Sequence, residues 1–181
     1  YESDQHTLGL WHFDEGSGNV VIDSSKNNIQ AVINGEARWN ANVIWNKEDS
    51  GNSFVFDEQR YVTIPVEDKT ANELLTSVVQ AVTVEAWVFA DSLEGQGGWK
   101  MVVTHWANQP GKYHLAVRDG IPQFQVTTNQ GIATALSPKV LETYSWYHLA
   151  GVYDGSSVKI YVDGVLEGTV PHSGTLVTSD S

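Results

Sequence analysis

The chain has 181 residues, of which 41% are hydrophobic and 18% charged, a composition typical of one globular domain rather than of a disordered chain. Its formal net charge of −12 repels phosphate groups and so argues against binding to nucleic acid or to an anionic membrane, and no apolar run is long enough to span a bilayer. Cysteine is absent, which excludes disulfides and thiolate chemistry.

Short apolar segments separated by polar turns fill the first half of the chain. Residues 7–13 are predicted to form a first strand, and polar loops follow at 14–19 and 23–28. Thr70 followed by Glu73 indicates one capped helical turn over 70–77. Further strands are predicted at 20–22, 29–33, 53–57, 61–66 and, as a long buried strand, 81–90.

The second half has clearer turn signals. Strands at 100–106, 113–118 and 121–127 are predicted to form a meander whose last turn is Asp119-Gly120, and a short strand follows at 132–136. Residues 146–168 predict three consecutive antiparallel strands, turned at 154–157 and at Asp163-Gly164. Many short strands with regular turns predict an all-β sandwich or barrel.

Three segments carry a resemblance to a known family. They are W-Y-H-L-A-G-V-Y-D-G-S-S-V-K-I-Y-V-D-G-V-L-E-G at 146–168, V-T-V-E-A-W-V at 82–88, and L-W-H-F-D-E-G-S-G at 10–18 with D-S-S-K-N at 23–27. In this order they resemble laminin-G-like, concanavalin-A-like jelly-roll domains. The resemblance implies a two-sheet antiparallel jelly-roll sandwich with a concave face, commonly a carbohydrate-binding or adhesion module, often with bound calcium.

One departure concerns the last strand. Domains of this family usually close with a strand that pairs near the first one, and here residues 170–177 are followed only by 178–181. We therefore expect residues 1–181 to form a single laminin-G-like jelly-roll domain that is incomplete at its C-terminus. The missing strand would come from another chain or from a segment outside this sequence.

A cation site is the first candidate for chemistry. The loops at 14–19 and 23–28 concentrate carboxylate and amide oxygens, which are the ligands that calcium prefers. Asp14 and Asp23 are the predicted ligands of a calcium ion. The alternative is that these residue types occur there because they stabilise turns.

A sugar-binding cluster is the second candidate. Aromatic and planar polar side chains, which suit the apolar face and the hydroxyls of a sugar ring, gather around the glycine-rich loop at 95–98 and the meander after it. The predicted ligand-binding residues are Trp99, His105, Trp106, Tyr113 and Arg118. The alternative is that Trp106 and Tyr113 belong to the core or its rim, and Trp11, Trp87 and Trp146 are interpreted as core because they lie in apolar strands.

Catalysis is not expected. Glycoside hydrolases of this fold carry several acids on one strand, whereas Glu85 has Trp87 and Phe89 at the next two alternate positions and is interpreted as a buried hydrogen-bond acceptor. We therefore expect a non-catalytic, lectin-like module of a larger extracellular or cell-surface protein, whose partner is a polysaccharide or glycan. The alternative is a protein-binding or structural adhesion domain without a sugar site. A sugar binder should expose Trp99 or Trp106, and a spacer domain should bury both.

Overall fold

A computed structural model describes residues 2–44, 50–64, 73, 77–78, 80–94, 98–105 and 112–177. The chain divides into two compact units, residues 1–77 and 78–181. The predicted all-β class is confirmed, because the described elements form antiparallel sheets. No helix within the described residues is long and apolar enough to cross a membrane. The predicted helical turn at 70–77 lies outside the described residues except for Glu73 and Ser77.

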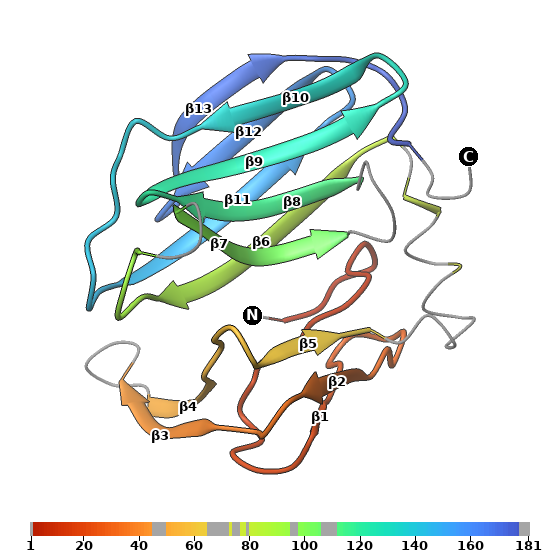
Figure 1. Cartoon of the computed structure of the whole chain (residues 1–181). Coiled ribbons are helices and arrows are strands. Elements are labelled where there is room, and N and C mark those ends of the chain that lie inside the picture. Colours follow the sequence, from red (N-terminus) through yellow and green to blue (C-terminus); the bar gives the residue numbers. More distant parts are fainter. Residues whose placement is uncertain are drawn as a thin grey trace. The chain divides into compact units, whose positions relative to one another are not determined.

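The first unit contains a three-stranded and a two-stranded sheet (Figure 1). The strand order is β1-β2-β5 in one sheet and β3-β4 in the other. A small core of Val21, Ala31, Ile33 and Phe54 holds the unit together. The strands are β1 (Val20–Val21), β2 (Ala31–Asn34), β3 (Trp39–Ile44), β4 (Ser50–Phe54) and β5 (Tyr61–Thr63).

The predicted first strand at 7–13 is wrong. This segment makes one isolated bridge, between Trp11 and Asp23, and Phe13 has a φ of 57°. A phenylalanine in the left-handed region interrupts an extended chain. The segment is anchored instead by its own polar contacts, such as the Leu10 N–H donating to the Asp23 carboxylate.

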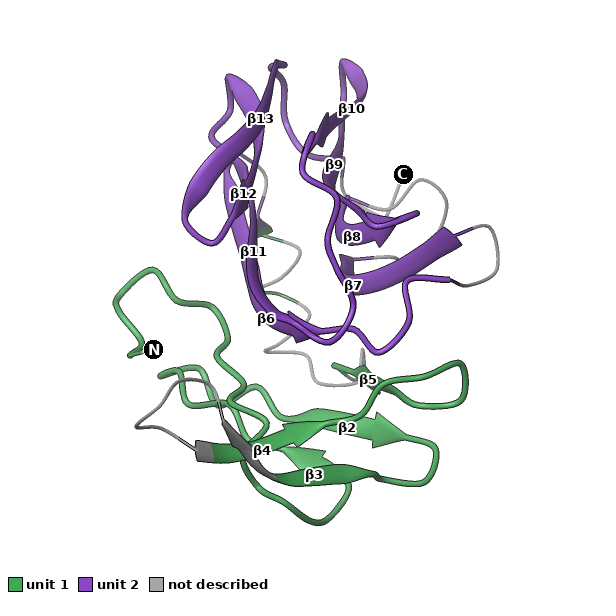
Figure 2. Ribbon diagram, turned by 90° about the vertical axis from the view of Figure 1, so that its left-hand side faces the viewer, with its two compact units in different colours: residues 1–77 green, residues 78–181 purple. Residues whose placement is uncertain are grey.

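The second unit consists of two four-stranded antiparallel sheets, seen edge-on in Figure 2. The orders are β10-β9-β8-β7 and β13-β12-β11-β6. The strands are β6 (Val82–Phe89), β7 (Trp99–His105), β8 (Tyr113–Arg118), β9 (Ile121–Thr128), β10 (Gly131–Leu136), β11 (Trp146–Tyr153), β12 (Ser157–Val162) and β13 (Val165–Pro171). β11, β12 and β13 follow each other along the chain, but β6 pairs with β11 across the whole intervening meander.

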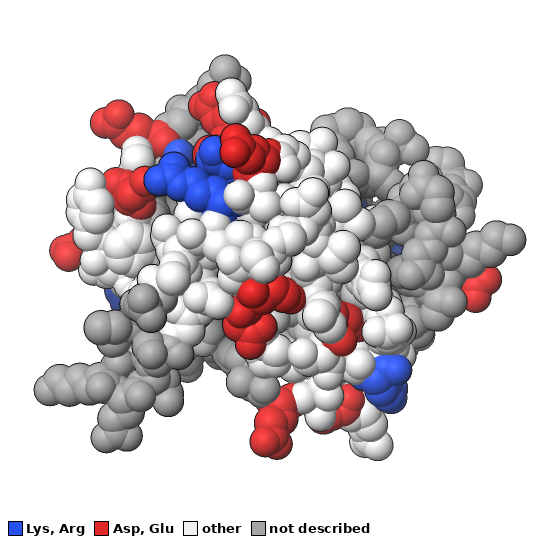
Figure 3. Space-filling model, turned by 90° about the horizontal axis from the view of Figure 1, so that it is seen from below, with Lys and Arg blue, Asp and Glu red and all other residues white. Residues whose placement is uncertain are grey.

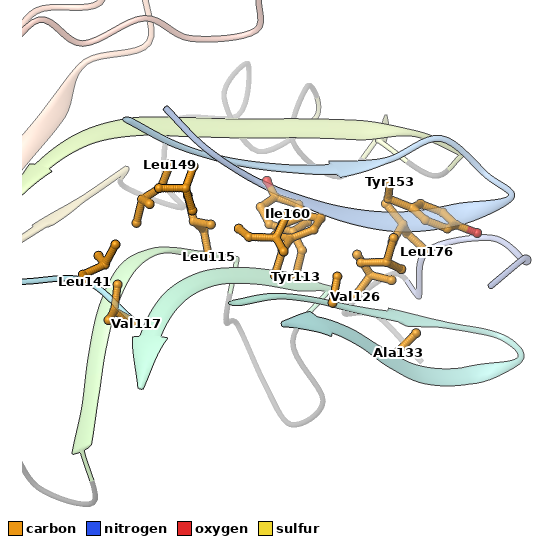
Figure 4. Close-up of a cluster of buried hydrophobic side chains, with 14 residues drawn as sticks. Tyr113, Leu115, Val117, Val126, Ala133, Leu141, Leu149, Tyr153, Ile160 and Leu176 are labelled. Atoms are coloured by element: carbon orange, nitrogen blue, oxygen red, sulfur yellow. The ribbon is translucent and has the colours of Figure 1, made fainter. Parts of the chain in front are cut away.

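The core of this unit lies between the two sheets (Figure 4). Because successive strand residues point to opposite faces, Leu115 of β8 and Phe124 of β9 point inward, and so do Leu149 of β11 and Ile160 of β12. All four side chains are fully buried. The residues that alternate with these side chains along each strand point to the opposite side, which is the outer face of each sheet.

Two predicted turns position the strands of both sheets. Asp119 and Gly120 have φ values of 51° and 79°, and Asp163 and Gly164 have 51° and 77°. Positive φ at both central residues is the requirement of a type I′ hairpin. The meander β7 to β10 and the three consecutive strands β11 to β13 therefore follow the sequence prediction, whereas the single-domain organisation stays a prediction.

Candidate functional site

The outer face of the β13-β12-β11-β6 sheet exposes several aromatic rings. In β6 the valines at 82, 84 and 88 pack against the core, and Glu85, Trp87 and Phe89 point the other way. Trp87 is 48% exposed and Phe89 45%. We use the name aromatic face for Glu85, Trp87, Phe89, Tyr144, Trp146 and His148.

Strand pairing places these side chains next to one another. Trp87 is opposite His148, with ring centroids 5.4 Å apart, and Phe89 is opposite Trp146, also at 5.4 Å. Tyr144, just before β11, contacts Phe89 with its ring centroid 6.4 Å away. Because these ring pairs are tilted or edge-on, the face is uneven, and large apolar surfaces remain open to solvent.

Polar groups border these rings. His148 Nε2 lies 3.4 Å from the Glu85 carboxylate, and the His148 backbone N–H donates to Asp163. Asp163 in turn accepts a bond from Lys139. Exposed apolar rings beside a carboxylate and an imidazole can offer a stacking surface and hydrogen-bonding groups to a ligand.

Sequence reasoning missed this face. The interpretation of Trp87 as core is wrong, and so is that of Glu85 as a buried acceptor, because both side chains are exposed. Trp11 and Trp146 are half-buried. The strict alternation in Val82–Phe89 contains the signal, since it puts a glutamate and a tryptophan on the same side of one strand.

The outer face of the other sheet brings together two of the predicted ligand residues. Trp99 of β7 and Arg118 of β8 are direct register partners, and the guanidinium carbon lies 5.0 Å from the indole centroid. The indole also makes an edge contact with His114, and burial lowers the pKa of that imidazole. Trp99 is 37% exposed, which is the arrangement expected of a sugar binder.

The structure separates His105 and Tyr113 from this pair. Their rings contact each other, with centroids 5.4 Å apart, and Tyr113 belongs to the buried core. Burial raises the pKa of Tyr113 to about 12, while burial and the nearby Lys112 charge lower the pKa of His105. Tyr113 thus follows the alternative interpretation, since a core phenol does not face solvent. Trp106 lies outside the described residues.

Asp23 has a structural environment rather than that of a calcium ligand. Each carboxylate oxygen accepts two hydrogen bonds: Oδ1 from the Leu10 and Ser25 N–H groups, and Oδ2 from the Ile29 N–H and the Ser25 hydroxyl. Burial alone would raise the pKa of Asp23, but these bonds outweigh it and lower the pKa. Because all its lone pairs are engaged, Asp23 does not fit the role of a metal ligand.

Asp14, the other predicted ligand, is exposed. Across the described residues, no three His, Asp or Glu side chains are grouped closely enough to hold a metal ion. Calcium binding by this chain therefore stays a prediction.

The charge distribution agrees with the acidic composition. The largest basic group visible in Figure 3 has acidic side chains beside it, and no extended basic surface forms on the described part of that face.

Comparison with known proteins identifies the fold. A family model described as the Concanavalin A-like lectin/glucanases superfamily matches residues 56–181. No curated protein matches the chain. The S-layer domain-containing protein of Clostridium thermocellum is similar in structure, with a TM-score of 0.50 at 22% identity, over 92% of this chain and 73% of that one.

Two further solved structures are similar to this chain. The receptor binding domain of botulinum neurotoxin mosaic serotype C/D has a TM-score of 0.50 at 15% identity, over 86% of this chain and 37% of that one. The heptameric SAP-like pentraxin of Limulus polyphemus has a TM-score of 0.42 at 18% identity, over 54% of this chain and 48% of that one. The chain thus spans about half the length of the pentraxin and less than half that of the neurotoxin domain. The likeness to the neurotoxin domain concerns the fold.

Proposed function

Because the chain belongs to the Concanavalin A-like lectin/glucanases superfamily, we propose that it is a non-catalytic carbohydrate-binding module whose aromatic face binds a glycan. The observation that carries this proposal is the exposure of Trp87 and Phe89 beside Glu85 and His148. A tryptophan costs little conformational entropy to present, and it offers an apolar surface as wide as a sugar ring.

The polar groups supply the orientation that stacking lacks. The Glu85 carboxylate accepts hydrogen bonds from sugar hydroxyls, and the His148 imidazole, held against it at 3.4 Å, offers a second polar edge. Both groups lie beside the Trp87 ring, so a sugar stacked on the indole has hydrogen-bonding partners at its rim. We propose no turnover, because Glu85 has no second acid at the next two alternate positions of β6.

The proposed setting is a larger protein outside the cell or on its surface. In this setting the chain holds a polysaccharide or glycan for a neighbouring domain. The family supports this role in general terms.

A glycan array with wild-type protein and a Trp87→Ala variant tests the proposal, run once with calcium and once with a chelator. We expect the variant to lose at least about tenfold in affinity for the glycans that the wild type binds, which corresponds to about 1.4 kcal/mol. Tyr61→Ala is the matched control, because it removes a ring that is 55% exposed from another part of the chain.

Either of two results would contradict the proposal. One is equal binding by wild type and Trp87→Ala. The other is silence of the folded wild type across the array, which would favour the adhesion alternative, with the aromatic face as a protein-docking surface. Binding that disappears with the chelator would restore calcium as a participant.

A further inference from the structure

We propose that the outer face of the β10-β9-β8-β7 sheet holds a second, independent binding site, which takes a neutral polyhydroxylated ligand of about one sugar ring. The site is a hollow of about 250 Å³ lined by Arg118, Asp119, Ile121, Gln123 and Leu136. Pockets for drug-sized ligands measure roughly 300–1,000 Å³, so this hollow suits a smaller molecule.

The side chain of Gln123 is the first reason to expect a ligand here. Gln123 is only 5% exposed, and its Nε2 is buried without a hydrogen-bond partner in the described structure. Buried amide groups are nearly always bonded, so an unpaired one requires an explanation. Gln123 also lines the hollow, and a half-turn of its amide, which exchanges the positions of Oε1 and Nε2, would let Nε2 donate to a ligand oxygen there.

The second reason is a pair of opposite charges at the rim. The Arg118 guanidinium lies over the Trp99 ring at 5.0 Å, and its Nε is 3.7 Å from the Asp119 carboxylate. At this distance the two groups attract each other without a direct hydrogen bond, which leaves donors on one and acceptors on the other. Adjacent hydroxyls on one sugar ring can accept a hydrogen bond from Arg118 and donate one to Asp119.

The same pair sets the class of ligand. An anionic ligand that approached Arg118 would also meet the Asp119 carboxylate, on a chain with a net charge of −12. A neutral polyol meets no such repulsion, because its hydroxyls both donate and accept. The apolar side chains of Ile121 and Leu136 complete the lining and suit the C–H groups of a ring.

This site does not depend on the aromatic face. The two lie on different sheets of the sandwich, and no residue belongs to both. Loss of the proposed function after Trp87→Ala would therefore leave the hollow unchanged, and the two proposals fail separately.

The test is a titration of ¹⁵N-labelled protein, followed by NMR, with methyl β-D-glucopyranoside, methyl α-D-mannopyranoside and methyl β-D-galactopyranoside, and with sodium D-glucuronate as the anionic comparison. We expect at least one neutral glycoside to shift the side-chain signals of Gln123 and Trp99, and glucuronate to shift neither. Gln123→Ala should weaken that binding about fivefold, the effect of one neutral hydrogen bond. Trp87→Ala is the control and should bind as the wild type does.

Asp119→Asn provides a second variant that keeps the fold. Asp119 is an exposed turn residue with a φ of 51°, a conformation that asparagine also tolerates. The Asp119→Asn variant should bind glucuronate, because the carboxylate that repels the anion is gone. The proposal is overturned if none of the three glycosides shifts the side-chain signals of Gln123 and Trp99 in the wild type. It is also overturned if the Trp99 shift persists undiminished in folded Gln123→Ala, or if the wild type binds glucuronate as well as it binds the glycosides.

Discussion

Replacement of Asp23 by alanine distinguishes a structural carboxylate from a metal ligand. The change removes the acceptor of four hydrogen bonds, three of them from backbone N–H groups. A hydrogen bond to a charged group contributes about 1.5–3 kcal/mol. The Ile29 N–H is buried and loses its partner outright, whereas the donors of Leu10 and Ser25 are partly buried and regain some water. We therefore expect a loss of about 2–4 kcal/mol in the free energy of unfolding.

The assay is urea unfolding of wild type and Asp23→Ala, monitored by circular dichroism, with calcium and with a chelator. A structural role predicts the same loss in both conditions. The matched control is Asp14→Ala, which removes an exposed carboxylate from the preceding loop and should change stability little. A loss that appears only with calcium would refute the reasoning, and so would a variant as stable as the wild type.

The pH dependence of the stability difference between wild type and Asp23→Ala gives a further check. The folded-state pKa of Asp23 is lowered from its ordinary value of 3.8. A lowered pKa means that Asp23 contributes stability above the unfolded-state value, and that this contribution is lost as the pH falls through the folded-state pKa. The difference in stability between wild type and Asp23→Ala should therefore be constant near neutral pH and shrink below about pH 3.8.

Three further predictions concern the core of the second unit. A Cβ at Gly151 would overlap the ring of Phe124, so Gly151→Ala should cost about 1–3 kcal/mol in urea unfolding, and an unchanged midpoint would show that the core yields. The Tyr153 hydroxyl donates to the Gly174 carbonyl at 2.5 Å, so Tyr153→Phe should cost about 1 kcal/mol and speed hydrogen exchange in the segment around Gly174; unaltered exchange there would count against that bond as an anchor. Burial raises the pKa of Tyr113 to about 12, so the step near that pH in an ultraviolet titration of the folded wild type should be absent from Tyr113→Phe. The stability of the wild type relative to this variant should fall above about pH 10, because the phenol of the unfolded chain ionises before that of the folded chain.

The strands and turns of the second unit could be predicted because their signals are local. Asp119-Gly120 and Asp163-Gly164 specify tight turns whatever surrounds them, and the residues between them alternate in polarity. The segment before Phe13 fails for the converse reason. Its apolar residues suggest a strand, but the hydrogen bonds made by Asp23 hold it in another conformation.

The candidate sites were harder to predict because they depend on side-chain direction. Trp99 and Arg118 share an outer face, whereas Tyr113, five residues before Arg118 on the same strand, points into the core. An odd separation along a strand reverses the face, so nearness in sequence says little about nearness in space. The apolar composition around Trp87 suggests a core residue, whereas the alternation along β6 puts its side chain on the outer face.

The pairing of β6 with β11 has a consequence for the order of folding. The strands of each meander lie next to each other along the chain and can pair after closing only short loops. β6 can pair only when its partner, on the far side of the β7–β10 meander, has already been brought near, and closing a longer loop costs more chain entropy. We therefore expect β6 to dock late during refolding and to detach early during unfolding. Pulse-labelling hydrogen exchange should then detect protection of the β12 amides before that of the β6 amides. Trp87, which lies on β6, would report the docking of that strand.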